Sequence, residues 1–288
     1  MIGLCTDSGS QLSAELQERY DIVVVPITVE VDGHEYLEGV DLDADQFYAA
    51  FADGHRPTVS TSQPSPGQFA LAYEELVDRG CTEVLSVHLG AAVSGTLNSA
   101  RLAAHKASIP IRLIDTGLAS FGVSCCTWAA AAVIAQGGSL DEAAQAAERV
   151  APLVGNVFTV SSLDLVRAGG RSGAALMDAG EVPGTPVLTL RNGKVESVGV
   201  AHSIDDAVQA MAAEALAWGP CINVAVGLAD RAGAAVSEAL ADRLRGEPSV
   251  NEIVTYRVGP SVGAHTGPGT AGAFYFPVLA GGSDRFSA

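Results

Sequence analysis

Apolar runs of strand length alternate with amphipathic segments through the first half of the chain. Runs rich in Val, Ile and Leu predict strands at 2–5, 22–31, 82–89 and 111–114. Helical spacing of apolar residues appears between them, in segments 11–20, 43–52, 67–79 and 94–107. Alternation of this kind is typical of a parallel sheet covered by helices on both faces. Ligands of such sheets bind beyond the carboxyl ends of the strands, which directs attention to loops 6–10, 89–95 and 115–120.

The pattern changes after two helices expected at about 119–136 and 139–153. Two more helices are expected at 204–217 and 231–245. Asn192-Gly193 between two strand-like runs predicts a β-hairpin. Six strand-like runs predict a mixed sheet, at 156–162, 186–190, 194–201, 221–229, 252–258 and 273–279. We therefore expect an α/β fold with a parallel-sheet domain at 1–155 and a mixed-sheet domain at 156–288.

Composition narrows the classes of partner. Of the 288 residues, 48% are hydrophobic and the mean hydropathy is +0.27, enough to bury a core together with an apolar cavity. The 33 acidic residues outnumber the 16 basic ones, for a net charge of −17. Because nucleic acids and anionic membranes attract clustered Lys and Arg, neither is an expected partner. An anionic ligand would have to be held by local groups.

The remaining sequence features predict a cytoplasmic protein without a cofactor. The five cysteines are odd in number and form no Cys-x-x-Cys pair, which is typical of buried thiols in a reducing compartment. The first residues read as a strand and not as a signal peptide. Segment 119–138 is uncharged, but its small and polar residues favour a buried helix over a membrane span. The six histidines show no metal-ligand spacing, and no phosphate-binding glycine-lysine loop is present.

Several polar loops could be either structural or functional. The stretch VSTSQPSPGQF, 59–69, places five hydroxyl or amide side chains just before a predicted helix. Asp7 and Ser8 follow the first strand, where capping of the next helix is the simpler interpretation. Ser94 and Gly95 stand at another helix start, which is either a cap or an anion site.

Two glycine-rich loops in the second half leave the same choice open. Arg167 and Arg171 flank the glycines of RAGGRSG, which is a surface turn or a phosphate contact. His265 and Thr266 lie in GPSVGAHTGPG, where glycines let the backbone approach a ligand closely. A histidine in a loop is more often structural, so His265 alone does not define a site.

Taken together, these motifs resemble one family. TDSGSQL, TSQPSPGQF, SGTLNSA, DTGLASFG, GGRSG and AHTGPG occur in the order and spacing of the DegV family, the fatty-acid-binding subunits of bacterial fatty acid kinases. The resemblance covers nearly the whole chain. It implies a three-layer α/β/α domain and a two-layer α/β domain, with a long-chain fatty acid in an apolar tunnel between them. It also implies a separate ATP-binding kinase subunit that phosphorylates the carboxylate, so that the acyl phosphate enters phospholipid synthesis.

The resemblance also implies roles for individual residues. Arg167, Arg171 and His202 are candidate contacts for the phosphate or the kinase. His202 stands where relatives often carry arginine, and Ala168 where they commonly carry a basic residue, so the departures concern the kinase contact. The fatty acid carboxylate would be held by Thr61, Ser62, Ser94, Gly95, His265 and Thr266. No residue is expected to be catalytic, and no cofactor or metal is expected.

The sequence also offers a candidate for the tunnel wall and an alternative function. Helix 119–136 is the candidate wall of the tunnel, through Phe121, Val123, Ala129 and Val133. The alternative function is a stand-alone enzyme acting on small acyl or phosphorylated substrates, with Ser94 as nucleophile and His265 as base. The fatty-acid-binding hypothesis is favoured, because no carboxylate is evident in the sequence to orient His265.

Overall fold

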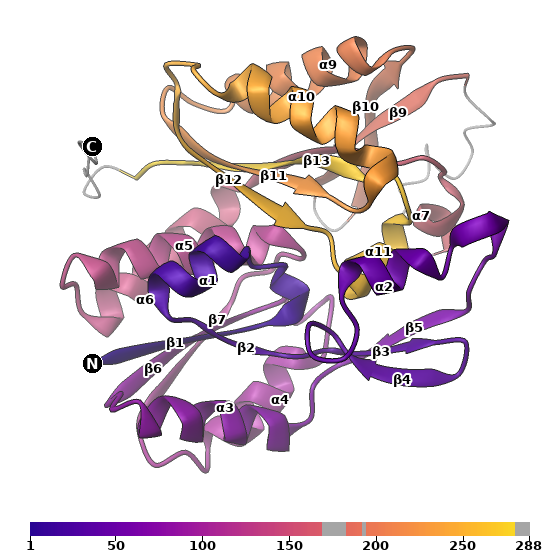
Figure 1. Cartoon of the computed structure of the whole chain (residues 1–288). Coiled ribbons are helices and arrows are strands. Elements are labelled where there is room, and N and C mark those ends of the chain that lie inside the picture. Colours follow the sequence, from indigo (N-terminus) through magenta and orange to yellow (C-terminus); the bar gives the residue numbers. More distant parts are fainter. Residues whose placement is uncertain (169–182, 192–193, 280–288) are drawn as a thin grey trace.

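A four-stranded parallel sheet forms the centre of the N-terminal part of the molecule. The computed structural model describes residues 1–168, 183–191 and 194–279 (Figure 1). The strand order of this sheet is β2-β1-β6-β7, and every pairing is parallel. Its strands are β1 (Ile2–Asp7), β2 (Val23–Val25), β6 (Glu83–His88) and β7 (Ile111–Asp115). The predicted parallel sheet is therefore confirmed.

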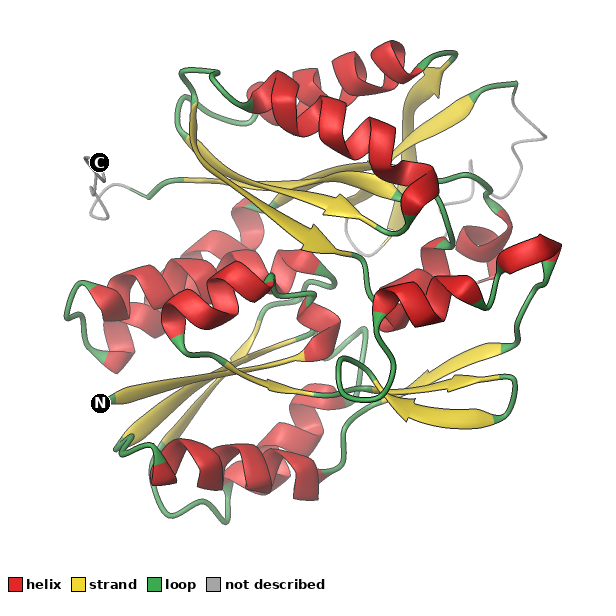
Figure 2. Cartoon of the chain, viewed as in Figure 1, coloured by secondary structure: helices red, strands yellow, loops and turns green. Residues whose placement is uncertain are grey.

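Helices cover both faces of this sheet. Helices α3 (Pro66–Asp78) and α4 (Thr96–Ala104) pack on one face (Figure 2). Helices α1 (Ala14–Tyr20), α5 (Phe121–Ala135) and α6 (Leu140–Val150) pack on the other. The expected three-layer arrangement is confirmed. In the described part of the chain, no helix is long and apolar enough to cross a membrane, and α5 is the buried helix that segment 119–138 predicted.

A six-stranded mixed sheet forms the C-terminal part. Its order is β10-β9-β8-β13-β11-β12, and only the β11–β12 pairing is parallel among the described strands. Helices α9 (Ile204–Leu216) and α10 (Ala234–Leu244) cover its outer face (Figure 1). The strands are β8 (Gly155–Thr159), β9 (Thr185–Arg191), β10 (Lys194–Ala201), β11 (Ile222–Leu228), β12 (Val250–Arg257) and β13 (Ala271–Pro277). The predicted mixed sheet and the β9–β10 hairpin are confirmed, whereas the turn Asn192-Gly193 lies outside the described residues.

The prediction of one strand over 22–31 is wrong. The chain leaves the parallel sheet after β2, and Pro26, which has no N–H for a ladder, stands between β2 and the next strand. That strand, β3 (Thr28–Val31), pairs with β4 (His34–Leu37) and β5 (Val59–Ser62) in a small antiparallel sheet. The hydroxyl-rich stretch therefore begins as a strand.

The prediction of an irregular loop at 259–269 is also wrong. Residues Pro260–Thr266 form helix α11, with proline in its first turn. Gly267 ends it with φ 76°, a left-handed conformation that favours glycine. The other short helices are α2 (Ala44–Ala49), α7 (Asp164–Ala168) and 3₁₀ turns at Ser8–Ser10, Ala52–Gly54, Ala151–Leu153 and Arg231–Gly233. Helix α11 packs on α7, α2, β3 and β5, so it joins the two parts of the molecule.

Candidate ligand cavity

A cavity of about 400 Å³ lies where the two parts of the molecule meet. Gly9, Leu89 and Ser120 contribute to its wall from the loops that follow β1, β6 and β7. The inner face of the six-stranded sheet, strand β5 and helix α11 complete it. The cavity thus lies at the carboxyl ends of the parallel strands, where the sequence directed attention.

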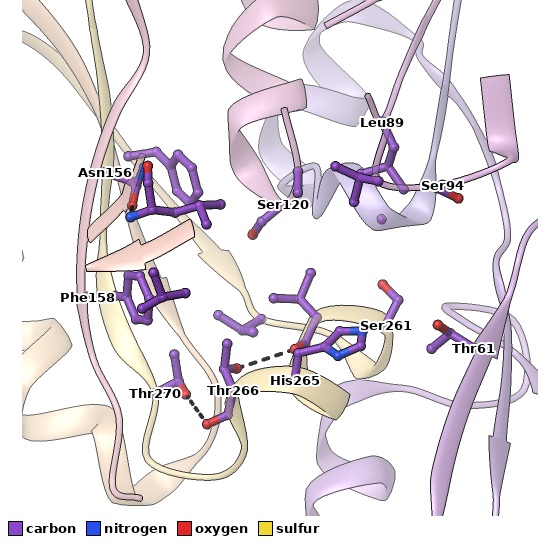
Figure 3. A pocket seen from close by; sticks show the side chains of 18 of the residues that line it. Thr61, Leu89, Ser94, Ser120, Asn156, Phe158, Ser261, His265, Thr266 and Thr270 are labelled. Carbon is purple, nitrogen blue, oxygen red and sulfur yellow. Dashed lines mark hydrogen bonds between the residues drawn. The ribbon is translucent and has the colours of Figure 1, made fainter. Parts of the chain in front are cut away.

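The six residues predicted to hold a carboxylate all line this cavity. They come from three distant segments: β5 with its Thr61 and Ser62, the turn before α4, and α11. Figure 3 shows Thr61, Ser94 and His265 around one side of the cavity. We call this side the hydroxyl end; its residues are Thr61, Ser62, Ser94, Gly95, His265 and Thr266. The structure brings these groups together, and their contact with a ligand stays a prediction.

Ser94 lies at the start of α4 and in the cavity wall. Its Oγ lies 2.8 Å from Thr96 Oγ1 and accepts a hydrogen bond from the Thr96 amide, at 3.3 Å, in the first turn of α4. The same side chain lies in the cavity wall. A Cβ at Gly95 would lie 2.5 Å from Oε1 of Gln63, so a larger residue there would displace the end of the Gln63 side chain. The N-cap residue of α4 is Gly95, so Ser94 is not the N-cap, although it accepts the first N–H of the helix and lines the cavity.

The opposite side of the cavity is apolar. Figure 3 places Phe158, with Asn156, across the cavity from Thr61 and Ser94. The amide of Asn156 is satisfied by the backbone of Leu190, at 2.9 and 2.7 Å, so it offers the cavity little polarity. We call this side the apolar end; its residues form one cluster of Phe158, Val166, Leu190 and Val195.

The predicted tunnel wall is wrong. Phe121 and Val123 are fully buried in the N-terminal core, and Ala129 and Val133 pack against that core. The cavity meets this region at Ala119 and Ser120, which precede α5. The apolar wall is instead the inner face of the second sheet. Phe121 and Trp128 of α5 pack against aromatic side chains of that sheet and do not line the cavity.

Ser120 and Ser261 are cavity residues that the sequence reading missed. Ser120 has φ 55° and ψ −149°, a conformation rarely adopted by non-glycine residues and concentrated at functional sites. Its hydroxyl projects into the cavity in Figure 3. Burial raises the pKa of the neighbouring Tyr256, and a hydrogen bond from Ser120 opposes that shift. The sequence signal for Ser120 was its position between a predicted strand and the helix that follows it.

Two of the candidate phosphate contacts, Arg167 and His202, do not line the cavity. Arg167 lies half-buried on α7, next to the cavity residue Val166. Arg171 lies outside the described residues. His202 is exposed ahead of α9, its backbone N–H donates to Asp206, and it is not part of the cavity wall. A role for Arg167 or His202 would therefore involve a partner protein and not the carboxylate in the cavity.

A serine, histidine and aspartate do form a linked chain, but away from the cavity. His88 bonds Ser86 Oγ through Nε2 at 2.6 Å and Asp7 Oδ2 through Nδ1 at 2.9 Å. All three are 0% exposed, so a substrate cannot reach them. The sequence predicted that Asp7 and Ser8 cap the first helix. That prediction is wrong, because Ser13 caps α1. The second carboxylate oxygen of Asp7 is buried without a hydrogen-bond partner among the described residues, which also contain no cluster suited to a metal ion.

Comparison with known proteins defines the family. The model described as "Uncharacterised protein, DegV family" matches residues 1–278, so the chain belongs to the DegV family. It is 35% identical over 279 residues to a DegV domain-containing protein of Streptomyces coelicolor, covering 94% of this chain and 96% of that one. Among solved structures it resembles a Thermus thermophilus DegV family protein described for its fatty acid binding, with TM-score 0.84, 30% identity and coverage of 96% and 99%. It also resembles DegV of Bacillus subtilis, described as a fatty acid binding protein, with TM-score 0.80, 25% identity and coverage of 96% and 99%.

Proposed function

We propose that this protein binds a long-chain fatty acid in the cavity, with the carboxylate at the hydroxyl end and the tail at the apolar end. The observation that carries the proposal is the division of one cavity into these two ends. A fatty acid is an anionic group on an apolar chain and matches that division. The fatty acid binding described for the Thermus thermophilus and Bacillus subtilis relatives supports it.

The two ends would contribute differently to binding. At about 0.8 kcal/mol per buried CH₂, a tail of roughly fourteen methylenes supplies on the order of 11 kcal/mol before the costs of association. The carboxylate needs donors, since an unpaired buried charge is expensive. Among the described residues, the cavity wall contains no Lys or Arg, so hydroxyls, the Gln63 amide, backbone N–H groups and His265 are the donors available.

We further propose that the bound carboxylate is presented to a separate ATP-dependent kinase subunit, for acyl phosphate formation and phospholipid synthesis. The hydroxyl end suits presentation, because neutral donors can orient a carboxylate and leave one oxygen reactive. The protein itself would supply no catalytic residue, and it would act in the cytoplasm. Transfer of ³²P from ATP to the bound fatty acid, with and without the kinase subunit of the same organism, tests this step.

The binding proposal is tested by native mass spectrometry of the purified protein, followed by solvent extraction. We expect one long-chain fatty acid per chain, of about 14–18 carbons, which brackets the roughly fourteen methylenes assumed above. An empty protein that hydrolyses acyl esters would contradict the proposal and favour the enzyme hypothesis, with Ser94 as nucleophile and His265 as base.

A further inference from the structure

Glu38 is a buried carboxylate at the junction of the two parts of the molecule. It directly follows β4 and is 5% exposed. Its Oε2 accepts a hydrogen bond from Ser8 Oγ at 2.5 Å, and its Oε1 accepts one from Gln11 Nε2 at 3.3 Å. Oε1 also accepts two from Ser261, through the backbone N–H and Oγ, both at 2.9 Å. One side chain thus joins the loop after β1 to the first turn of α11.

The directions of these hydrogen bonds are fixed by their neighbours. Ile27 N–H donates to Ser8 Oγ at 2.9 Å, which leaves the Ser8 hydrogen for Glu38. Gln11 Nε2 lies 2.8 Å from Ser8 O, 3.1 Å from Ser261 Oγ and 3.3 Å from Glu38 Oε1, so its two hydrogens are shared among three acceptors. Because Ser261 Oγ accepts from Gln11, its own hydrogen is left for Glu38. Every partner of Glu38 is therefore a donor, as a buried carboxylate requires. The Ser261 hydroxyl is consequently held away from the cavity that it borders.

Helix α11 depends on such contacts for its orientation. It has seven residues, too few to be stable alone. Ser261 and His265 are four residues apart and share one face of it, and both line the cavity. Figure 3 shows the two side chains beside each other, with the His265 ring extending toward Thr61. A contact that fixes Ser261 therefore also fixes the part of α11 from which the His265 side chain extends.

We infer that Glu38 is a positioning residue of the hydroxyl end, which sets His265 against Thr61 and Ser94 by holding Ser261 and the first turn of α11. The inference rests on the proposed function. Glu38 is not part of the cavity wall and does not touch a ligand there. Its effect reaches the ligand through α11, so its loss should change the head group environment more than retention of the tail.

The test compares Glu38→Gln with Glu35→Gln, which removes the same charge from an exposed position on neighbouring β4. Each protein is loaded with [1-¹³C]palmitate, and the bound carboxyl resonance and the palmitate content are measured. The His265 ring ¹⁵N resonance is recorded on lipid-free protein, assigned by its loss in His265→Gln. Melting temperatures confirm that each variant is folded.

We expect Glu38→Gln to displace both resonances while retaining palmitate within about three-fold, because the tail supplies most of the affinity. Glu35→Gln should match the natural protein. Ser8→Ala removes one contact of Glu38 together with the acceptor of the Ile27 N–H, but keeps both hydrogen bonds from Ser261 to Glu38, and should displace both resonances by less; it also serves if Glu38→Gln does not fold. An unmoved His265 resonance in folded Glu38→Gln would overturn the inference. A natural protein that binds no palmitate would overturn the proposed function alone, because the His265 measurement needs no ligand.

Discussion

The hydroxyl end and the apolar end of the cavity are built in opposite ways. The apolar end is one continuous cluster formed by the inner face of a single sheet and Val166 of the adjoining helix α7. The hydroxyl end gathers side chains from β5, the turn before α4, and α11, each from a different part of the sequence. Apolar contact needs only matching surface, whereas a carboxylate needs donors at defined positions. We therefore expect substitutions at the apolar end to change which lipid binds, and those at the hydroxyl end to change how its head group is held.

The largest effect is expected for Ser94→Ala. A charge-assisted hydrogen bond is worth roughly 1.5–3 kcal/mol, modest beside the tail. A head group displaced by about 1 Å, however, can lose on the order of 100-fold in transfer. We expect the variant to retain fatty acid and to be phosphorylated about 100-fold more slowly by the kinase subunit. Normal transfer per folded molecule with a lower melting temperature would instead leave Ser94 with a role in helix stability only.

A second substitution tests the apolar end. Val195→Phe adds volume inside the cluster, and overpacking typically costs about 1–3 kcal/mol. The affinity for the longest fatty acids should fall most, so the fatty acids extracted from the variant should be shorter. Ala129→Phe on α5 is the matched control, because Ala129 does not line the cavity. Shorter extracted chains in the control, or unchanged chain lengths in Val195→Phe, would show that the tail does not lie against the second sheet.

The dependence of the free energy of unfolding on pH should show that the pKa of Glu38 differs between the folded and unfolded states. Burial raises its pKa above the ordinary value of 4.5, while the hydrogen bonds from Ser8, Ser261 and Gln11 act against that shift. Since the folded state has the higher pKa, this contribution to stability is complete below about pH 4.5 and is lost as the pH rises through the folded value. The free energy of unfolding of Glu38→Gln, measured in urea, should therefore rise relative to that of the natural protein between pH 4 and 7. Parallel curves would show that Glu38 has the same pKa in both states.

The smallest effect is expected for His202→Arg. His202 is exposed and away from the cavity, so fatty acid content should stay unchanged. If it meets the phosphate or the kinase, phosphorylation of the natural protein should be faster at pH 6 than at pH 8, because only protonated histidine is cationic. The arginine variant should lose that difference, after correction for the pH profile of the kinase itself. Equal rates and partner affinities in both proteins would exclude His202 from the contact.

The sequence predicted the regular architecture and the residues of the hydroxyl end, but not how the cavity is closed. Strands and helices with clear periodicity lie where they were expected. Helix α11 was missed because glycines dominate its segment, and the separate β3 strand was missed because Val and Ile run on across Pro26. Glu38 carries no local signal at all. Its partners lie about 30 and 223 residues away along the chain, and only the tertiary fold brings them together.

The direction of the bound fatty acid is the central claim, and anomalous diffraction from crystals containing 16-bromohexadecanoic acid tests it most directly. The bromine marks the end of the tail, and its position does not depend on interpreting weak lipid density. We predict a single bromine peak beside Phe158 and Val195, with the carboxylate among Thr61, Ser94 and His265. A bromine peak at the hydroxyl end, or outside the cavity, would contradict the account.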